Sequence, residues 1–201
     1  MEFETFAPLT ALPFIAHAFT LRTAADTRSG EFSNRLLRRF GFHSAATAEQ
    51  THGNGVVEAT GPGGHPGVDA LITRQPGLPL HIRCADCAAV FIVDQRMPAI
   101  ALIHSGKKGT QLNIVGHTLA AMHRHFGTQA TDCRAVISPS IGPCHYEVDL
   151  WAGIEQQLHG AGVTDFHNPR VCTACHLDRY FSYRAEKGQT GRMLAQLILK
   201  R

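Results

Sequence analysis

Two long apolar runs constrain the fold of this chain most strongly. Residues 89–94 read AVFIVD and residues 99–105 read AIALIHS, and the four residues between them, QRMP, have the composition of a turn. Both runs are apolar nearly throughout and do not alternate with polar residues, which is typical of strands that are covered on both faces. The sequence therefore predicts a layered protein with a buried sheet.

Helical spacing begins soon after the second run. Five apolar residues between positions 110 and 127 follow one another at intervals of three and four, which predicts a helix. Other segments are expected to form helices at 33–41, 149–162 and 190–201, and strands at 12–22, 70–73, 80–84 and 133–142. Strands interleaved with helices predict an α/β (α+β) fold around a mixed sheet, and the length suits a single domain over residues 1–201.

Composition excludes several classes of protein. The net charge of +3 is mild and no long basic run is present, so we expect no nucleic-acid partner. No window approaches 18 consecutive apolar residues, and the N-terminus lacks the basic start of a signal peptide. Six cysteines are then expected to be thiols or ligands of a cytoplasmic protein. Thirteen histidines make a metal or acid–base site worth seeking.

The cysteines include two Cys-x-x-Cys pairs, CADC at 84–87 and CTAC at 172–175. The pairs are too far apart in the sequence for a compact zinc ribbon, and no clear amphipathic helix follows the first pair as in a thioredoxin-like site. We therefore expect Cys84 to be a buried small apolar residue. The adjacent Cys175 and His176 are compatible with a second site, but packing near the C-terminal loop is the favoured interpretation.

Three segments place a histidine or cysteine beside small residues at the edge of a predicted strand. They contain His52, Cys87 and His104. Histidine and thiolate ligands suit zinc, and three protein ligands with an open fourth position are the pattern of catalytic zinc. The same Cys87 and His104 would also suit a cysteine hydrolase, with the thiol as nucleophile and the imidazole as its base.

Six motifs occur in an order that identifies a family. They are QTHG, DALIT, ADCAAVFIVD, ALIHSGKKGT, SPSIGPCHYEVD and CTACHLDRYFSYRAEKGQTGRMLA. Together they resemble the YfiH/laccase-domain family, whose members are variously labelled multicopper polyphenol oxidase, peptidoglycan editing factor and purine nucleoside phosphorylase. The resemblance covers residues 14–198. It implies a three-layer α/β/α domain with a mixed sheet.

The resemblance also implies a site and an activity. His52, Cys87 and His104 match the family's zinc ligands, so zinc is the expected cofactor. Family members phosphorolyse purine nucleosides such as adenosine, inosine, guanosine and methylthioadenosine, and can deaminate adenosine. Nucleoside and phosphate are thus the expected partners. The laccase label does not follow from this sequence, because the repeated His-x-His strand motifs of a multicopper site are missing.

Several charged residues are candidates for substrate binding. The resemblance points to Arg35 as the anion holder and as a catalytic residue with Cys87 and His104; the alternative is a solvent-facing helix arginine. It also matches Arg192 in TGRM, for which the alternative is that it braces the last helix. Asp86 precedes a zinc ligand and is a candidate hydrogen-bond partner of the site.

Two motifs depart from the family pattern. HAGWRG is usual where HSGKKG stands, so Lys107 and Lys108 replace an aromatic residue and an arginine; lysine is a flexible point charge and not a planar fork. The hypothesis is that one of these lysines holds phosphate or another anionic group; the alternative is that both are solvated turn residues. His145 stands where a cysteine is usual. The leading hypothesis is a zinc-dependent purine nucleoside phosphorylase with adenosine deaminase activity; the alternatives are a cysteine hydrolase or a metal-binding family member without turnover.

Overall fold

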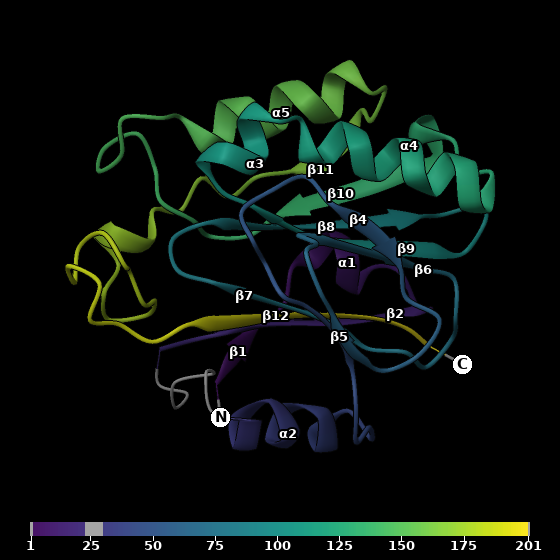
Figure 1. Cartoon of the computed structure of the whole chain (residues 1–201), viewed down its shortest axis with the longest axis horizontal. Coiled ribbons are helices and arrows are strands. Elements are labelled where there is room, and N and C mark those ends of the chain that lie inside the picture. The colour runs from purple at the N-terminus through teal and green to yellow at the C-terminus, as the bar shows by residue number, and fades with distance from the viewer. Residues whose placement is uncertain (1, 23–29, 201) are drawn as a thin grey trace.

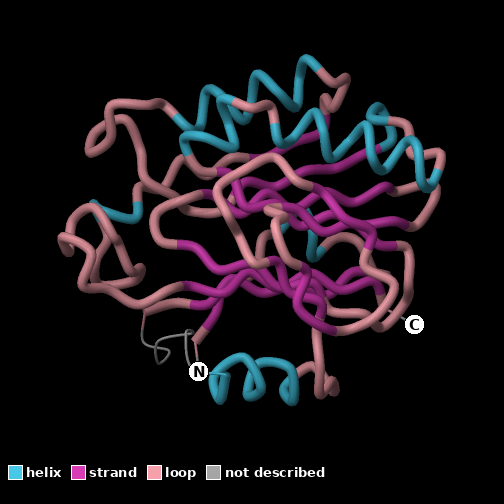
Figure 2. The backbone as a smooth tube through the Cα atoms, viewed as in Figure 1, coloured by secondary structure: helices cyan, strands magenta, loops and turns pink. Residues whose placement is uncertain are grey.

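The computed structural model describes residues 2–22 and 30–200. In these ranges the strands form two six-stranded mixed sheets, and helices cover the outer face of each (Figure 2). The layers therefore follow one another as helix, sheet, sheet, helix. The predicted α/β class with mixed pairing is confirmed. The strands divide between two sheets, one layer more than the predicted central sheet, because an apolar strand face can be covered by another sheet as well as by helices.

One sheet contains the two apolar runs that dominate the sequence. Its strands are, in spatial order, β11 (Asp165–His167), β10 (Cys133–Ile137), β8 (Ala88–Asp94), β9 (Ala99–Ser105), β6 (Ala70–Thr73) and β4 (Val56–Glu58). Every residue of β8 and β9 is buried, as predicted. Alternate side chains explain why: Val90 and Ile92 pack among the helices, whereas Phe91 and Val93 pack against the other sheet.

The second sheet corrects one prediction. Its strands are, in spatial order, β1 (Phe3–Glu4), β2 (Ile15–Thr20), β12 (Met193–Leu199), β7 (Leu80–Cys84), β3 (Ala46–Ala48) and β5 (Gly63–His65). The helix predicted at 190–201 is wrong, because β12 is a fully buried strand that pairs antiparallel with both β2 and β7. A short continuous apolar run is compatible with either structure, and here pairing on both edges decides.

The helices other than α1 (Ala7–Thr10) lie on the outer faces of the two sheets (Figure 1). α3 (Lys107–Gln111), α4 (Ile114–Phe126) and α5 (Leu150–Gly160) cover the sheet that contains β8 and β9. The predicted helix at 110–127 is thus interrupted between α3 and α4, where Asn113 has a φ of 56°. α2 (Gly30–Arg39) covers the other sheet, and α1 (Ala7–Thr10) contacts strands of both sheets.

Two crossings between the sheets position the site. The chain passes from β3 to β4 through the segment that contains His52, and from β7 to β8 through the segment that contains Cys87. β9 ends next to the second crossing, since Ala88 pairs with Ser105. Among the described residues, no helix has the length and apolar character that crossing a membrane requires.

Candidate metal centre

The structure brings the three predicted ligands together. The ligand atoms of His52, Cys87 and His104 all lie within 4.8 Å of one another. The two imidazole rings are 4.9 Å apart between centroids and are inclined by 78°. His104 is buried, Cys87 is partly buried and His52 is exposed, so the cluster is open on one side.

A buried carboxylate, Asp69, orients the cluster. Nδ1 of His104 donates to its Oδ1 at 2.8 Å, which leaves Nε2 of His104 free to bind an ion. The backbone N–H groups of His52 and Gly53 donate to the same carboxylate at 2.9 and 2.7 Å, and these bonds hold His52 at a φ of 60°, where non-glycine residues are uncommon. Burial raises the pKa of Asp69, but the bonds from His104 and Gly53 outweigh it and lower the pKa.

Asp69 was missed in the sequence, although it is the first residue of the motif DALIT. The residue predicted for this role, Asp86, faces elsewhere. Its carboxylate accepts from Oγ1 of Thr173 at 2.7 Å and from the backbone N–H of Arg184 at 2.8 Å. Asp86 therefore holds η2 (Thr173–Cys175) and the segment that follows it, and neither of these bonds involves the three ligands.

The cysteine and the buried histidine shift each other's pKa in opposite directions. Burial raises the pKa of the Cys87 thiol, yet the neighbouring His104 and His52 lower it to about 6. Burial lowers the pKa of His104, but Cys87 and the hydrogen bond to Asp69 raise it to about 9. Between these values a thiolate faces an imidazolium. A metal ion would replace that proton, because thiolate and neutral imidazole are its ligand forms.

The backbone leaves little space behind the thiolate. A Cβ atom placed on Gly106 would lie 2.6 Å from Sγ of Cys87 and 3.6 Å from Cδ2 of His52. Glycine is therefore required at the turn that follows β9. The donor set, the fixed His104 tautomer and the close backbone together fit a metal ion held by three protein ligands with one side open.

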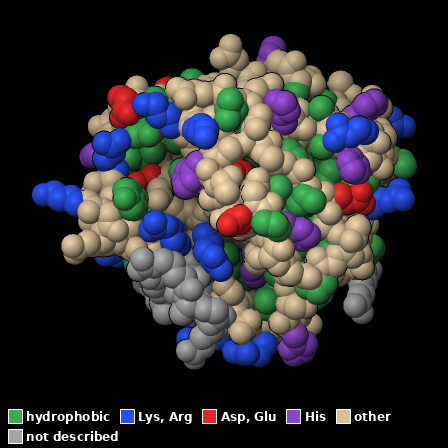
Figure 3. All heavy atoms as spheres, in the orientation of Figure 1, with side chains coloured by type: hydrophobic (Ala, Val, Ile, Leu, Met, Phe, Trp, Pro, Cys, Tyr) green, Lys and Arg blue, Asp and Glu red, His purple; other side chains and the backbone are tan. Residues whose placement is uncertain are grey.

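The open side faces a cavity of about 1160 Å³. Its charged lining is mostly basic: Arg83, Lys107, Lys108, Arg184, Lys187 and Arg192, with Glu49 and Asp86 as the acidic residues. Tyr146 and Tyr183 add two aromatic rings. Figure 3 shows several Lys and Arg side chains around a hollow on the left of the face in view. Such a lining favours an anionic ligand with a flat ring.

The predicted substrate-binding residues fall into two groups. Lys107, Lys108 and Arg192 line the cavity, and Nζ of Lys107 lies 3.2 Å from Oε1 of Glu147. Arg35 is exposed on α2, which covers the outer face of the other sheet (Figure 1), and it is not among the lining residues. The structure thus brings three of the four together, and the role of Arg35 stays a prediction.

Comparison with known proteins assigns the chain to a family. The family model described as multi-copper polyphenol oxidoreductase laccase matches residues 26–149 and 148–200. The chain belongs to this laccase-like family, and the resemblance seen in its motifs is confirmed. Two solved structures share its fold: YlmD from Geobacillus stearothermophilus and the hypothetical protein YfiH of Bacillus licheniformis both superpose with a TM-score of 0.90, at 23% and 22% identity. The match covers 99% of both chains for YlmD, and 98% of this chain and 99% of the other for YfiH.

Curated relatives carry the name purine nucleoside phosphorylase. The relative from Deinococcus radiodurans is 32% identical over 97% of this chain and 92% of its own length. The relative from Bacteroides thetaiotaomicron is 35% identical over 66% of this chain, and the chain spans only 61% of that relative's length. YlmD of Geobacillus stearothermophilus is 30% identical over 73% of this chain and 69% of its own length.

Proposed function

We propose that this chain is a zinc-dependent purine nucleoside phosphorylase. The observation that carries the proposal is a three-ligand metal cluster that opens into a basic cavity with two tyrosine rings. The names of the curated relatives support the same activity. The reaction joins phosphate to C1′ of the ribose and breaks the bond between C1′ and the purine nitrogen; the base leaves with the electron pair and takes up a proton.

His52, Cys87 and His104 would hold the zinc, since two imidazoles and a thiolate are ligands that this ion prefers. When bound there, the ion supplies Lewis acidity toward an oxygen of the reactants. The protein's own contribution is orientation: Asp69 fixes His104, and Gly106 keeps the backbone clear of Cys87. Because the metal ligands are held in place, the reactants that bind there would be held in one geometry, which lowers the entropic cost of the reaction.

Basic side chains in the cavity would bind the phosphate. Lys107 and Lys108 follow His104 in the sequence, and Arg184, from the segment after η2, lines the same cavity. Positive charge held in advance around a dianion lowers the cost of bringing it to C1′. The guanidinium of Arg184 lies 4.7 Å from the ring centre of Tyr146, so this arginine is already oriented by an aromatic face. Tyr183 offers an exposed ring to a purine.

Adenosine deamination is a second activity that we propose for the same site. Attack on C6 of adenine requires an activated water, which a Lewis-acidic ion supplies, and a proton donor for the departing ammonia. The reaction needs no phosphate. Phosphate dependence therefore separates the two activities in one assay.

One observation favours a different class of enzyme. Cys87, His104 and Asp69 form a chain of thiolate, imidazolium and carboxylate, which is the arrangement of a cysteine hydrolase. Zinc content discriminates between the two readings, because a bound ion occupies the thiolate. A protein with about one zinc at this cluster resists alkylation of Cys87, whereas a free nucleophile is alkylated and inactivated.

The test is a panel of nucleosides incubated with zinc-loaded protein, with and without phosphate, and analysed for free base and ribose 1-phosphate. We expect base release that requires phosphate and that is lost in Cys87→Ala. Equal release without phosphate would indicate a hydrolase. No release at all, with zinc in place, would leave a metal-binding family member without turnover. Oxygen consumption with a phenol would instead support the oxidase label of the family model.

A further inference from the structure

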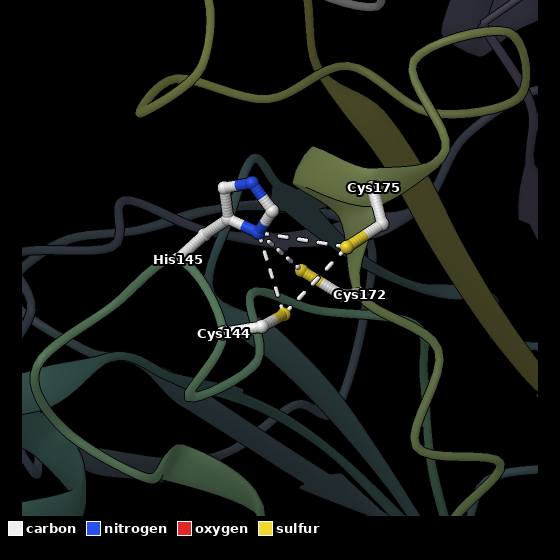
Figure 4. Close-up of side chains that lie close together, drawn as sticks. All are labelled: Cys144, His145, Cys172 and Cys175. Carbon is white, nitrogen blue, oxygen red and sulfur yellow. Dashed lines mark hydrogen bonds between the residues drawn. The ribbon is translucent and has the colours of Figure 1, made fainter.

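A second group of metal-ligating side chains lies outside the triad. It consists of Cys144, His145, Cys172 and Cys175, whose ligand atoms all lie within 4.8 Å of one another. Figure 4 shows the three sulfurs and Nδ1 of His145 pointing toward a common centre. The first two residues precede α5, Cys172 immediately precedes η2, and Cys175 is the last residue of η2. The favoured sequence interpretation, that Cys175 and its neighbour merely pack near a loop, does not account for this convergence.

The spacing of the four donors fits a tetrahedral ion. With zinc–sulfur bonds of about 2.3 Å and zinc–nitrogen bonds of about 2.0 Å, two sulfurs lie about 3.8 Å apart and a sulfur and a nitrogen about 3.5 Å apart. Sγ of Cys144 and Cys175 are 3.6 Å apart. Nδ1 of His145 lies 3.3, 3.8 and 3.5 Å from Sγ of Cys144, Cys172 and Cys175. These four distances are thus close to those expected for four of the six edges of one tetrahedron.

The backbone around the group holds the donors in place. A backbone hydrogen bond links the two segments that contain the donors: the N–H of Thr173 donates to the carbonyl of Ser140 at 3.1 Å. The N–H of Cys175 donates to the carbonyl of Cys172 at 3.2 Å, which closes a tight Cys-x-x-Cys turn. The N–H of Gly142 also donates to Sγ of Cys172 at 3.2 Å. A hydrogen bond to sulfur of this kind supports a thiolate ligand.

We propose that Cys144, His145, Cys172 and Cys175 bind a structural zinc ion. Four protein ligands leave no open position for a substrate, which distinguishes this group from the three-ligand cluster. Three thiols and an imidazole also form a soft donor set that disfavours magnesium or calcium. A disulfide between two of the cysteines would leave the remaining thiol and His145 without a role.

The position of this site indicates which segments the ion would stabilise. One ligand-bearing segment continues directly into Tyr146 and Glu147, and the other leads to Tyr183 and Arg184. Arg184 contacts both Tyr146 and Glu147, with Nη2 at 3.4 Å from Oε2 of the latter. The ion would therefore fasten together two segments that form one wall of the cavity. This role concerns the shape of the wall and does not depend on which reaction takes place there.

The first experiment counts metal. Protein purified without chelator and supplied with zinc chloride is dialysed and analysed for zinc. We expect two zinc ions per chain in the wild type, one in Cys175→Ser and one in Cys87→Ser. His176→Ala is the matched control, since this exposed histidine follows Cys175 but is outside the group, and it should keep two.

The second experiment identifies the ligands. Cobalt exchanged into Cys87→Ser should show the strong ultraviolet charge-transfer absorption of three thiolates and the visible bands of a tetrahedral ion. Cobalt in Cys175→Ser should show only the weaker signal of one thiolate at the triad. Retention of that triad signal also shows that the variant is folded, which is expected because Cys175 is exposed.

Several results would overturn the proposal. Two zinc ions in Cys175→Ser would mean that the second ion lies elsewhere. One zinc ion in the wild type, together with a mass of the unreduced protein that is lower than that of the reduced protein by two hydrogen atoms, would mean a disulfide in place of an ion. Amide hydrogen exchange provides a readout apart from metal content. The amide groups of residues 141–149 and 176–187 should exchange faster in Cys175→Ser. Unchanged exchange would contradict the proposal that the ion holds these two segments together.

Discussion

Nδ1 of His104 lies 2.8 Å from Oδ1 of Asp69, and both side chains are buried. The same carboxylate also receives the N–H groups of His52 and Gly53, so one side chain orients two metal ligands. Asp69→Asn would present an amide that cannot accept all of these bonds. We expect zinc affinity at the triad to fall by about 10- to 100-fold. Competition with a chelating dye measures the change, and Asp94→Asn, a buried aspartate away from the site, should leave the affinity unaltered.

Gly106→Ala should disrupt the triad by a steric clash alone. Its Cβ would come within 2.6 Å of Sγ of Cys87, so the thiolate has to move away from the other ligands. We expect loss of zinc from the triad with little change in secondary structure. Gly61→Ala is the control, because nothing lies within 4 Å of its Cβ position. Zinc analysis measures the occupancy of the triad, and circular dichroism measures the secondary structure. Full zinc occupancy in Gly106→Ala would show that the backbone of the turn can move to accommodate the added methyl group.

The paired lysines should affect phosphate and not metal. Lys107 and Lys108 line the cavity next to His104. We expect the double alanine variant to raise the KM for phosphate by about 10-fold, which corresponds to about 1.4 kcal/mol, while zinc content stays constant. Lys200→Ala, whose Nζ donates to the carbonyl of Pro13 away from the cavity, is the control. Wild-type phosphate dependence of the double variant across a salt titration would assign the anion to the arginines of the cavity.

Acid should destabilise the fold through a buried histidine. Nε2 of His17 accepts from the backbone N–H of Phe6 at 2.7 Å, and burial, with a smaller effect of Lys200, lowers the pKa of His17 to about 4. The unfolded chain takes up a proton near pH 6.5 and the folded chain only near pH 4. The free energy of unfolding therefore falls as the pH drops through this range, by about 3 kcal/mol from this residue.

Urea denaturation of chelator-treated protein tests this pH dependence. His17→Gln keeps an acceptor without a titrating group, so its stability should depend less on pH between 6.5 and 4. The exposed His43 provides the matched variant, His43→Gln, which should retain the wild-type slope. An equal slope in His17→Gln would show that other groups cause the loss of stability in acid.

The sequence predicts the strands and helices whose apolar spacing is unambiguous. α4 follows from its helical spacing, and β8 and β9 follow from two apolar runs that a short turn-like segment joins. β12 does not, since its residues MLAQLIL include strong helix formers, and its partners β2 and β7 are far away in the sequence. The division into two sheets is a matter of long-range pairing, which local composition does not encode.

The candidate site shows the same limit of local patterns. The triad emerges from motif resemblance, and the structure then brings its members together. Asp69 was missed because one carboxylate before a strand has many ordinary explanations. The second group was missed because its two halves, Cys144 with His145 and Cys172 with Cys175, look incomplete when each is compared with a standard zinc motif. The two halves meet through long-range contacts such as the pairing of Ser140 with Cys172.

β12 lies in the middle of its sheet, between β2 near the start of the chain and β7. During synthesis, β2 and β7 must therefore wait for residues 193–199 to emerge from the ribosome before either can be paired along its inner edge. Until then both apolar strands present open hydrogen-bonding edges to other chains. Closing a contact across so much sequence is slow, so we expect newly made protein to depend on chaperones or low temperature for a good yield.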